Sequence, residues 1–261
     1  MRIIVCIKQV PDTMEVQIDP ETGTLQREGI ESVVNPLDLY AIEEGIRLKE
    51  KHGGTVIALS MGPPQAEKAL REALALGCDE AFLLSDRALA GADTWATAYT
   101  LACAVRKIGV YDLIVCGLKT TDGDTAQVGP GLAEELGIPH VSYVGKIVNV
   151  TKEAATLERP IEESYEVVEA PLPCLITVTK EINMPRLPSF RRKIQARKME
   201  VVVWSASDLN GEKNRFGLEG SATRVIKVFP PPPRPGGEML SGNAKSQAEA
   251  LIQKLRERHM I

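Results

Sequence analysis

The first half of the chain alternates short apolar runs, rich in β-branched residues, with longer segments whose apolar residues recur at helical spacing. Runs that are apolar throughout are typical of strands buried on both faces, and helices between successive strands are typical of parallel connections. The pattern predicts strands at residues 2–8, 55–60, 80–84 and 111–116, and helices at residues 36–51, 64–76 and 93–108, with a further helix that ends at Gly137. We therefore expect an open, mainly parallel, doubly wound α/β sheet.

Beyond Gly137 the strand-like segments follow one another without helices between them, which favours antiparallel hairpins that extend the sheet. This antiparallel extension covers about residues 140–204, with strands expected at 141–150, 154–159, 165–169, 175–179 and 199–204.

A C-terminal arm follows. The prolines within residues 229–237 favour an extended polyproline conformation, and a helix is expected at residues 245–258. The apolar side of that helix either docks on a partner or packs against the chain's own domain. The expected organisation is an α/β domain over residues 1–229, followed by a Pro-rich linker and partner-docking helix over residues 230–261.

The composition of the 261 residues argues against several classes of function. A formal net charge of -4 gives no electrostatic reason to expect nucleic-acid binding. The apolar run after Met1 is too short for a signal peptide or a membrane span, so we expect a cytoplasmic protein without membrane insertion. The five cysteines and three histidines show no metal-ligand spacing, and the chain offers no convincing catalytic constellation. If the protein performs redox chemistry, a bound cofactor must supply the reactive atoms.

The most informative segment, GLKTTDGDTAQVGPG at residues 117–131, leads from the fourth expected strand into a helix. In an open parallel sheet, ligands bind outside the carboxyl ends of the strands. Gly117 can let the backbone approach a ligand, Gly123 can take a positive φ in a tight turn, and Lys119 adds a positive charge. The free N–H groups of residues 125–128 would point from the helix start towards an anion. The segment predicts a pyrophosphate-binding loop, and the alternative is an ordinary capped loop.

Two further strand ends and one helix start can converge with this loop on one crevice. At the helix start, residues 35–38, Asn35 suits an N-cap and Pro36 suits the first helical position. Plain helix capping is therefore the alternative to ligand contact there. The carboxylates of Asp122 and Asp124 fit a phosphate site if they bind backbone groups or ribose hydroxyls while only the amides meet phosphate.

Five long segments carry a resemblance to a known family: VCIKQVPDT, NPLDLYAIEEGIRLKE, ALSMGPPQAEKALREALALGCDEAFLL, DLIVCGLKTTDGDTAQVGPGLAEELG and EINMPRLPSFRRKIQARK. In this order they resemble the beta subunit of electron-transferring flavoproteins, the family that includes the FixA-type proteins. The resemblance implies a nucleotide-binding subunit paired with an alpha subunit that carries FAD; in ordinary members the beta subunit holds a structural AMP. The cofactor contacts that it implies are Cys6, Asn35, Pro36, Leu37, Asp38, Met61, Gly117, Leu118, Lys119, Thr120, Thr121, Asp122, Gly123, Asp124, Thr125, Ala126, Gln127 and Val128.

Two segments, residues 122–130 and 158–166, resemble the electron-bifurcating branch of this family. The resemblance implies that the beta subunit binds FAD in the AMP position, with NADH beside it. It further implies hydride transfer from NADH, followed by electron transfer to the alpha-subunit FAD and an acyl-CoA-type or other flavin dehydrogenase, and to ferredoxin or flavodoxin. Arg159 either lies near a flavin or a nicotinamide phosphate, or is a surface cation paired with Glu162 or Glu163.

Residues 183–189 match the family's partner-recognition loop, with Leu187 at or near the apolar anchor between Arg186 and Pro188. The one strongly basic stretch begins there and either steers acidic redox partners or is a solvated surface. It comprises Arg186, Arg191, Arg192, Lys193, Arg197 and Lys198.

Two alternatives to bifurcation stay open. One keeps the family but makes the chain a non-bifurcating electron carrier with AMP. The other is a nucleotide-binding regulatory module of similar fold without redox function.

Overall fold

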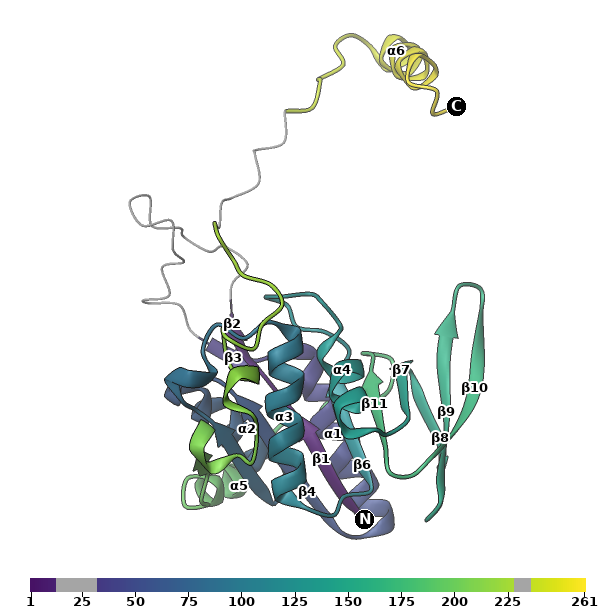
Figure 1. Cartoon of the computed structure of the whole chain (residues 1–261). Helices are drawn as coiled ribbons and strands as arrows, with labels where there is room; N and C mark the ends of the chain where they lie inside the picture. Colours follow the sequence, from purple (N-terminus) through teal and green to yellow (C-terminus); the bar gives the residue numbers. More distant parts are fainter. Residues whose placement is uncertain (13–31, 228–235) are drawn as a thin grey trace. The chain divides into compact units, whose positions relative to one another are not determined.

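The computed structural model of the chain describes residues 1–12, 32–227 and 236–261 (Figure 1). The chain divides into two compact units: described residues up to Ile226 belong to the first, and those from Lys227 onward belong to the second. Most of the proline run at 229–237 lies outside the described residues. Its extended conformation, and a domain boundary at 229, therefore stay predictions.

Seven parallel strands form the central sheet of the first unit, in the order β12-β5-β4-β1-β6-β11-β7. They are β1 (Arg2–Cys6), β4 (Thr55–Met61), β5 (Glu80–Leu84), β6 (Leu113–Gly117), β7 (His140–Val144), β11 (Cys174–Val178) and β12 (Val202–Trp204). From β1 the chain moves through β4 to β5, and then crosses to β6 on the other side of β1. The direction of winding therefore reverses between β1 and β6, and ligands bind at the carboxyl ends of strands at such a point.

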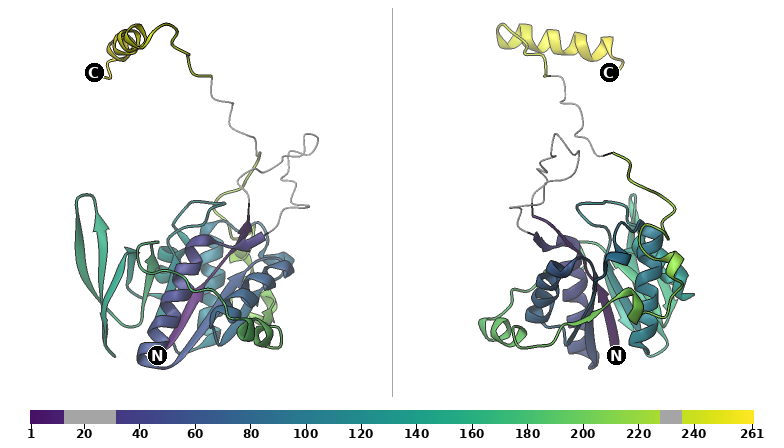
Figure 2. Two further views of the ribbon diagram at one scale, coloured as in Figure 1. Left: turned by 180° about the vertical axis from the view of Figure 1, so that it is seen from behind. Right: turned by 60° about the vertical axis from the view of Figure 1, so that its left-hand side comes forward.

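Helices cover both faces of this sheet, which confirms the predicted doubly wound fold. Helices α1 (Pro36–His52) and α2 (Glu67–Leu76) cover one face, and α3 (Thr94–Ile108) and α4 (Val128–Leu136) cover the other (Figure 2). Alternate side chains of β1 pack towards opposite faces. Ile3 and Val5 pack with the side chains of α1 and α2, whereas Ile4 and Cys6 pack with those of α3 and α4. Both faces of the strand are therefore apolar, as the sequence pattern indicated.

The antiparallel extension is smaller than predicted. It contains β8 (Lys146–Val150), β9 (Ala154–Ile161) and β10 (Ser164–Pro171), and lies beyond β7 in Figure 1. The strand expected at 141–150 is divided at Gly145 into β7 and β8, and β11 lies between β6 and β7. Assigning β7, β11 and β12 (the strand expected at 199–204) to the antiparallel extension was wrong, because β11 pairs with β7, and β12 with β5, in parallel. All five residues of β11 are buried, so this strand needs cover on both faces, which the parallel sheet provides.

Several short elements were not expected from the sequence. They are the antiparallel pair β2 (Gln9–Pro11) and β3 (Ser32–Val34), the helix α5 (Phe190–Ala196), and the 3-10 turns η2 (Arg87–Leu89), η3 (Ala206–Asp208) and η4 (Lys213–Arg215). The 3-10 turn η1 (Pro64–Ala66) forms the start of the helix that was predicted at residues 64–76. In the second unit, α6 (Ala244–Glu257) forms where a helix was predicted, and the side chain of Asn243 caps it by accepting the N–H of Ser246. Its docking on a partner stays a prediction. Every helix in the described ranges is too short or too polar to cross a lipid bilayer.

Candidate functional site

The loop between β6 and α4, residues 118–127, is joined to the end of β1 by an ion pair. Lys8 Nζ lies 2.9 and 2.7 Å from the two carboxylate oxygens of Asp122. Partial burial opposes ionisation of Asp122, but the hydrogen bond and charge of Lys8 lower its pKa overall. Within the loop, Lys119 Nζ lies 2.8 Å from Asp124, whose carboxylate raises the pKa of the lysine. Lysines therefore neutralise both aspartates, which differs from the expectation that these carboxylates bind backbone groups or ribose.

The second half of this loop carries a row of unpaired backbone donors. Five consecutive N–H groups, those of residues 125–129, have no acceptor within the described residues. Ala126 has a left-handed φ of 55° and Gln127 is right-handed, an alternation that turns successive N–H groups towards one point and forms an anion-binding concavity. The last two donors open α4, so its helix dipole adds partial positive charge. This agrees with the predicted row of donors at residues 125–128.

The glycines of the loop have roles that differ from those predicted. Gly123 does not take a positive φ; the left-handed residues are Asp124 (51°) and Ala126 (55°). Gly117 was expected to admit a ligand, but a Cβ there would overlap the Asp38 carboxylate and the backbone of Leu37. The absence of a side chain at Gly117 therefore lets the start of α1 pack against the end of β6.

A buried polar pair lies between the start of α1 and the loop. Asn35 is 0% exposed and Asp38 is 4% exposed. The N–H of Lys8 donates to Asp38 Oδ2 at 2.7 Å, and Asn35 Nδ2 donates to Asp38 Oδ1 at 2.9 Å. Asn35 Nδ2 also donates to the carbonyl of Lys119 at 3.0 Å, and Asn35 Oδ1 accepts the N–H of Thr121 at 3.2 Å. Asn35 occupies the N-cap position, as predicted, but its side chain makes no capping hydrogen bond because it binds the loop instead.

The remaining predicted contacts also lie at this end of the sheet. Cys6 and Cys116 lie in register on neighbouring strands, and a hydrogen bond with Cys6, together with burial, raises the pKa of the Cys116 thiol. Met61 ends β4, next to β1, and is half-buried. Pro36 and Leu37 form the first turn of α1. The strand ends, the start of α1 and the loop into α4 are thus brought together at the point where the winding reverses.

Comparisons with known proteins identify the family. Residues 22–209 match the family described as "Electron transfer flavoprotein domain". The chain is 51% identical to the electron transfer flavoprotein subunit beta of Thermoanaerobacterium thermosaccharolyticum, over 100% of both chains. The chain belongs to this family as a beta subunit. It is also 47% identical to the caffeyl-CoA reductase-Etf complex subunit CarD of Acetobacterium woodii, over 100% of both chains. Identity to protein FixA of Azorhizobium caulinodans is 44%, over 99% of this chain and 95% of the relative.

Two residues of the beta subunit that contact the β6–α4 loop or the start of α4 were missing from the predicted contacts. Lys8 is the first cation after β1, and its position at a strand end could have indicated its pairing with the loop. Thr177 is the one polar residue of β11, a signal that was available in the sequence. Its hydroxyl accepts the N–H of Tyr143 at 3.2 Å, and a Cβ on Gly129 would lie 2.6 Å from its methyl group. Thr177 thus sets how closely α4 approaches the sheet.

The predicted recognition loop is held against α1 of the beta subunit. Arg186 lies 2.8 Å from Glu43 and 2.6 Å from Glu50, while Asn183 Nδ2 donates to Glu44 at 2.9 Å. Leu187, the predicted anchor, is 91% exposed. The segment therefore combines a fixed polar side with an exposed apolar residue, although its role in partner recognition stays a prediction.

Arg159 of the beta subunit pairs with a residue other than the two considered. Its guanidinium lies 2.7 Å from Glu166, its cross-strand neighbour on β10, rather than against Glu162 or Glu163. Neighbouring antiparallel strands place these side chains on one face of the sheet. The pairing favours the interpretation of Arg159 as a surface cation.

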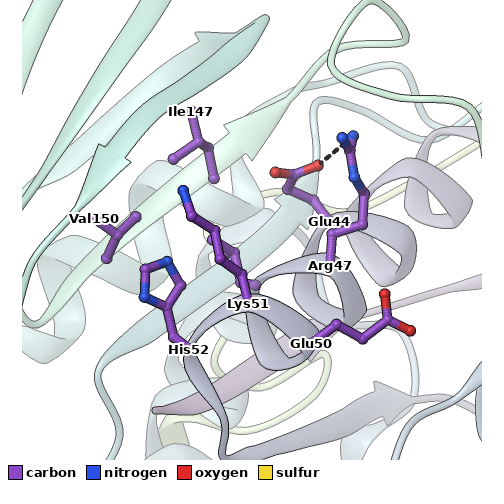
Figure 3. Close-up of a pocket in the computed structure, with 8 residues that line it drawn as sticks. Glu44, Arg47, Glu50, Lys51, His52, Ile147 and Val150 are labelled. Atoms are coloured by element: carbon purple, nitrogen blue, oxygen red, sulfur yellow. Dashed lines mark hydrogen bonds and ion pairs between the residues drawn. The ribbon is translucent and has the colours of Figure 1, made fainter.

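Two cavities of the beta subunit lie along α1, and none of their lining residues belongs to the β6–α4 loop. The larger, about 450 Å³, is bounded by the C-terminal half of α1 and by β8 (Figure 3), with the lining residues Glu44, Arg47, Leu48, Glu50, Lys51, His52, Ile147 and Val150. The second, about 270 Å³, lies under the recognition segment. The helix α1 follows β1 and runs back towards the amino ends of the strands, so its later turns, which line both cavities, lie towards those ends. Ligands of an α/β sheet usually bind at the carboxyl ends instead. We therefore assign the site by its chemistry to the carboxyl edge of the sheet, where the β6–α4 loop is open to solvent.

Proposed function

We propose that this beta subunit binds an adenine dinucleotide by its diphosphate, that the dinucleotide is FAD, and that NADH binds beside it. The observation that carries the proposal is the row of five backbone N–H groups at residues 125–129, at the carboxyl edge of the sheet where the winding reverses. Such donors match the oxygens of a diphosphate. The pairing of Asp122 with Lys8, and of Asp124 with Lys119, lowers the repulsion that free carboxylates would exert on it.

FAD would supply hydride acceptance from NADH and onward electron transfer, while the chain itself binds and orients the cofactor. As electron acceptors we propose the FAD of an alpha subunit together with an acyl-CoA-type or other flavin dehydrogenase, and ferredoxin or flavodoxin on a second branch. The name of the Acetobacterium woodii relative, a subunit of a caffeyl-CoA reductase-Etf complex, supports a role next to a reductase.

The exposure of the loop supports an arrangement in which the alpha subunit completes the site. Residues 121–125 are all exposed in this chain. Sites for cofactors usually enclose most of the ligand surface. A ligand held by these amides would therefore need cover from another chain.

An alternative within the family is a non-bifurcating carrier with AMP, since the same amides could hold one phosphate. The open space at Gly123, where a Cβ would meet only Thr120 Oγ1 at 3.4 Å, favours the longer ligand. Family membership disfavours a regulatory module without redox function.

The flavin content of the purified heterodimer tests the proposal. We expect FAD in both subunits and no AMP after denaturation and chromatographic analysis. One FAD with one AMP would reject FAD in this subunit and support the non-bifurcating carrier. A heterodimer that releases only the FAD of the alpha subunit would refute nucleotide binding by this chain. Reduction of ferredoxin by NADH that depends on the dehydrogenase and its oxidised substrate would support two electron branches.

A further inference from the structure

The buried pair Asn35 and Asp38 connects three segments at the carboxyl edge of the sheet. Asp38 joins the start of α1 to the end of β1, because it accepts the N–H of Lys8. Asn35 joins the same helix start to the loop, because it donates to the carbonyl of Lys119 and accepts the N–H of Thr121. The two side chains also bind each other at 2.9 Å. Together they fix the ends of β1 and β6 relative to α1.

Burial argues against direct contact between this pair and a nucleotide. Asn35 is 0% exposed and Asp38 is 4% exposed, so neither side chain presents a free surface to a ligand. The hydrogen-bonding atoms of both side chains are already satisfied by the chain itself. Gly117 closes the space beside Asp38, because a Cβ at Gly117 would overlap the carboxylate.

We propose that Asn35 and Asp38 are positioning residues, which hold the first half of the β6–α4 loop so that the N–H groups of residues 125–129 meet a diphosphate. The proposal rests on the proposed nucleotide site. It replaces direct ligand contact, the role that the family resemblance implied for these two positions, with an indirect one.

The ionised form of Asp38 is the one that fits these contacts. The N–H of Lys8 donates to Oδ2 and the amide of Asn35 donates to Oδ1, so both oxygens act as acceptors, which is the role of the ionised form. Burial raises the pKa of Asp38 to about 7, against the opposing effect of these hydrogen bonds and of the Lys8 charge. The other ionisable groups near it are the thiol of Cys116 and the ammonium of Lys8, which pairs with Asp122.

The pH dependence of nucleotide affinity separates a positioning role from a simple charge effect. If ionised Asp38 holds the loop, affinity falls as the pH drops from 8 to 6, by up to about tenfold when only the ionised form binds. If Asp38 acted merely as a negative charge near the diphosphate, protonation would relieve repulsion and affinity would rise instead.

Titration of the nucleotide-depleted heterodimer with ADP-ribose at pH 6, 7 and 8 provides the test. ADP-ribose carries the adenosine and diphosphate of FAD but lacks a terminal phosphate that would itself titrate near pH 6. We expect Asp38→Asn to weaken binding at least tenfold at pH 8 and to flatten the pH profile. Asn35→Ala should weaken binding at all three pH values. The control is Asp112→Asn, since Asp112 accepts the N–H of Arg2 at the opposite end of β1.

Each outcome decides between the proposals. Wild-type heterodimer that does not bind ADP-ribose would overturn the proposed nucleotide site itself. The positioning role alone would be overturned if the wild-type heterodimer binds ADP-ribose and Asp38→Asn binds it equally well. It would also be overturned if the wild-type affinity rises at low pH. If Asp38→Asn does not fold, the wild-type pH profile and Asn35→Ala still decide the question.

Discussion

Replacing Gly123 with aspartate tests the phosphate loop by charge alone. Gly123 has no left-handed φ, and a Cβ at this position would meet only Thr120 Oγ1, at 3.4 Å, which is an ordinary contact. The backbone therefore tolerates a side chain, and we expect the fold to survive. The nearby cations offer little compensation for a third carboxylate, because Lys8 already pairs with Asp122 and Lys119 with Asp124.

The expected loss of affinity follows from Coulomb's law. A carboxylate roughly 7 Å from a bound phosphate, at an effective dielectric constant of about 20, raises the energy by about 2 kcal/mol. This corresponds to roughly 30-fold weaker binding of a diphosphate-containing ligand. Screening by salt should reduce the effect, because the loop is exposed and the Debye length is about 10 Å at 0.1 M ionic strength.

The dissociation constant of ADP-ribose, the FAD content and the rate of NADH oxidation of the heterodimer measure this loss. Gly123→Asn is the matched control, since it has the same shape without the charge. We expect Gly123→Asn to bind nearly as well as wild type and Gly123→Asp to lose most of its second FAD. Equal affinities for the two variants, or an Asp variant with unchanged FAD content and NADH oxidation, would refute a diphosphate at this loop.

Three further substitutions test packing, recognition and charge. Gly129→Ala should destabilise the fold by about 1–3 kcal/mol in denaturant unfolding, because the new Cβ would lie 2.6 Å from the methyl of a buried threonine. Arg186→Met should slow electron transfer to the dehydrogenase and lower stability by about 1–3 kcal/mol, because it leaves the buried Glu43 without its partner. The pKa of Asp38 is raised from 3.8 to about 7, so the folded chain binds this proton more tightly than the unfolded chain. The contribution of Asp38 to stability therefore falls as the pH rises from about 4 to 7, by up to about 4 kcal/mol, and Asp38→Asn should abolish this fall in unfolding measured across that window.

Matched variants control these three experiments. Gly131→Ala should cost less than Gly129→Ala, since its Cβ would lie 3.1 Å from the small side chain of Ala98. Arg191→Met removes an exposed cation from the same basic stretch and should leave stability unchanged. If Arg191→Met slows electron transfer as much as Arg186→Met does, the loss in both variants comes from general steering by charge. If the pH dependence of wild-type stability persists in Asp38→Asn, groups other than Asp38 cause it.

Much of the fold could be predicted because strands buried on both faces leave continuous apolar runs in the sequence. The same property explains why β11 was misassigned. Its run, CLITV, resembles that of the other buried strands, but it follows the hairpin of β9 and β10 in the chain. The order of the strands along the chain does not say which strands pair. The sequence could therefore not distinguish a strand that belongs to the hairpin region from one that returns to the parallel sheet.

The location of the candidate site could be predicted, but most of its contacts could not. A parallel sheet brings its strand ends together whatever their side chains, so the topology alone placed the loop beside Cys6 and Met61. The pairing of Lys8 with Asp122 joins residues 114 positions apart, and no local pattern encodes it. Asn35 had a sufficient local explanation as an N-cap, which concealed its contact with the loop.

The helix α1 supports both the proposed nucleotide site and the predicted recognition segment. Its first turn provides Asp38, which binds the end of β1, and its later turns provide Glu43 and Glu50, which hold Arg186. Between these ends Ile42 and Ile46 are buried in the core, so the helix is anchored along its length. Asp38 and Arg186 share no partner, and substitutions at separate sites without shared partners usually act independently. We therefore expect Arg186→Met to leave ADP-ribose affinity unchanged and Asp38→Asn to leave docking of the dehydrogenase intact. Loss of both functions in either variant would show that α1 couples the two sites instead of holding them independently.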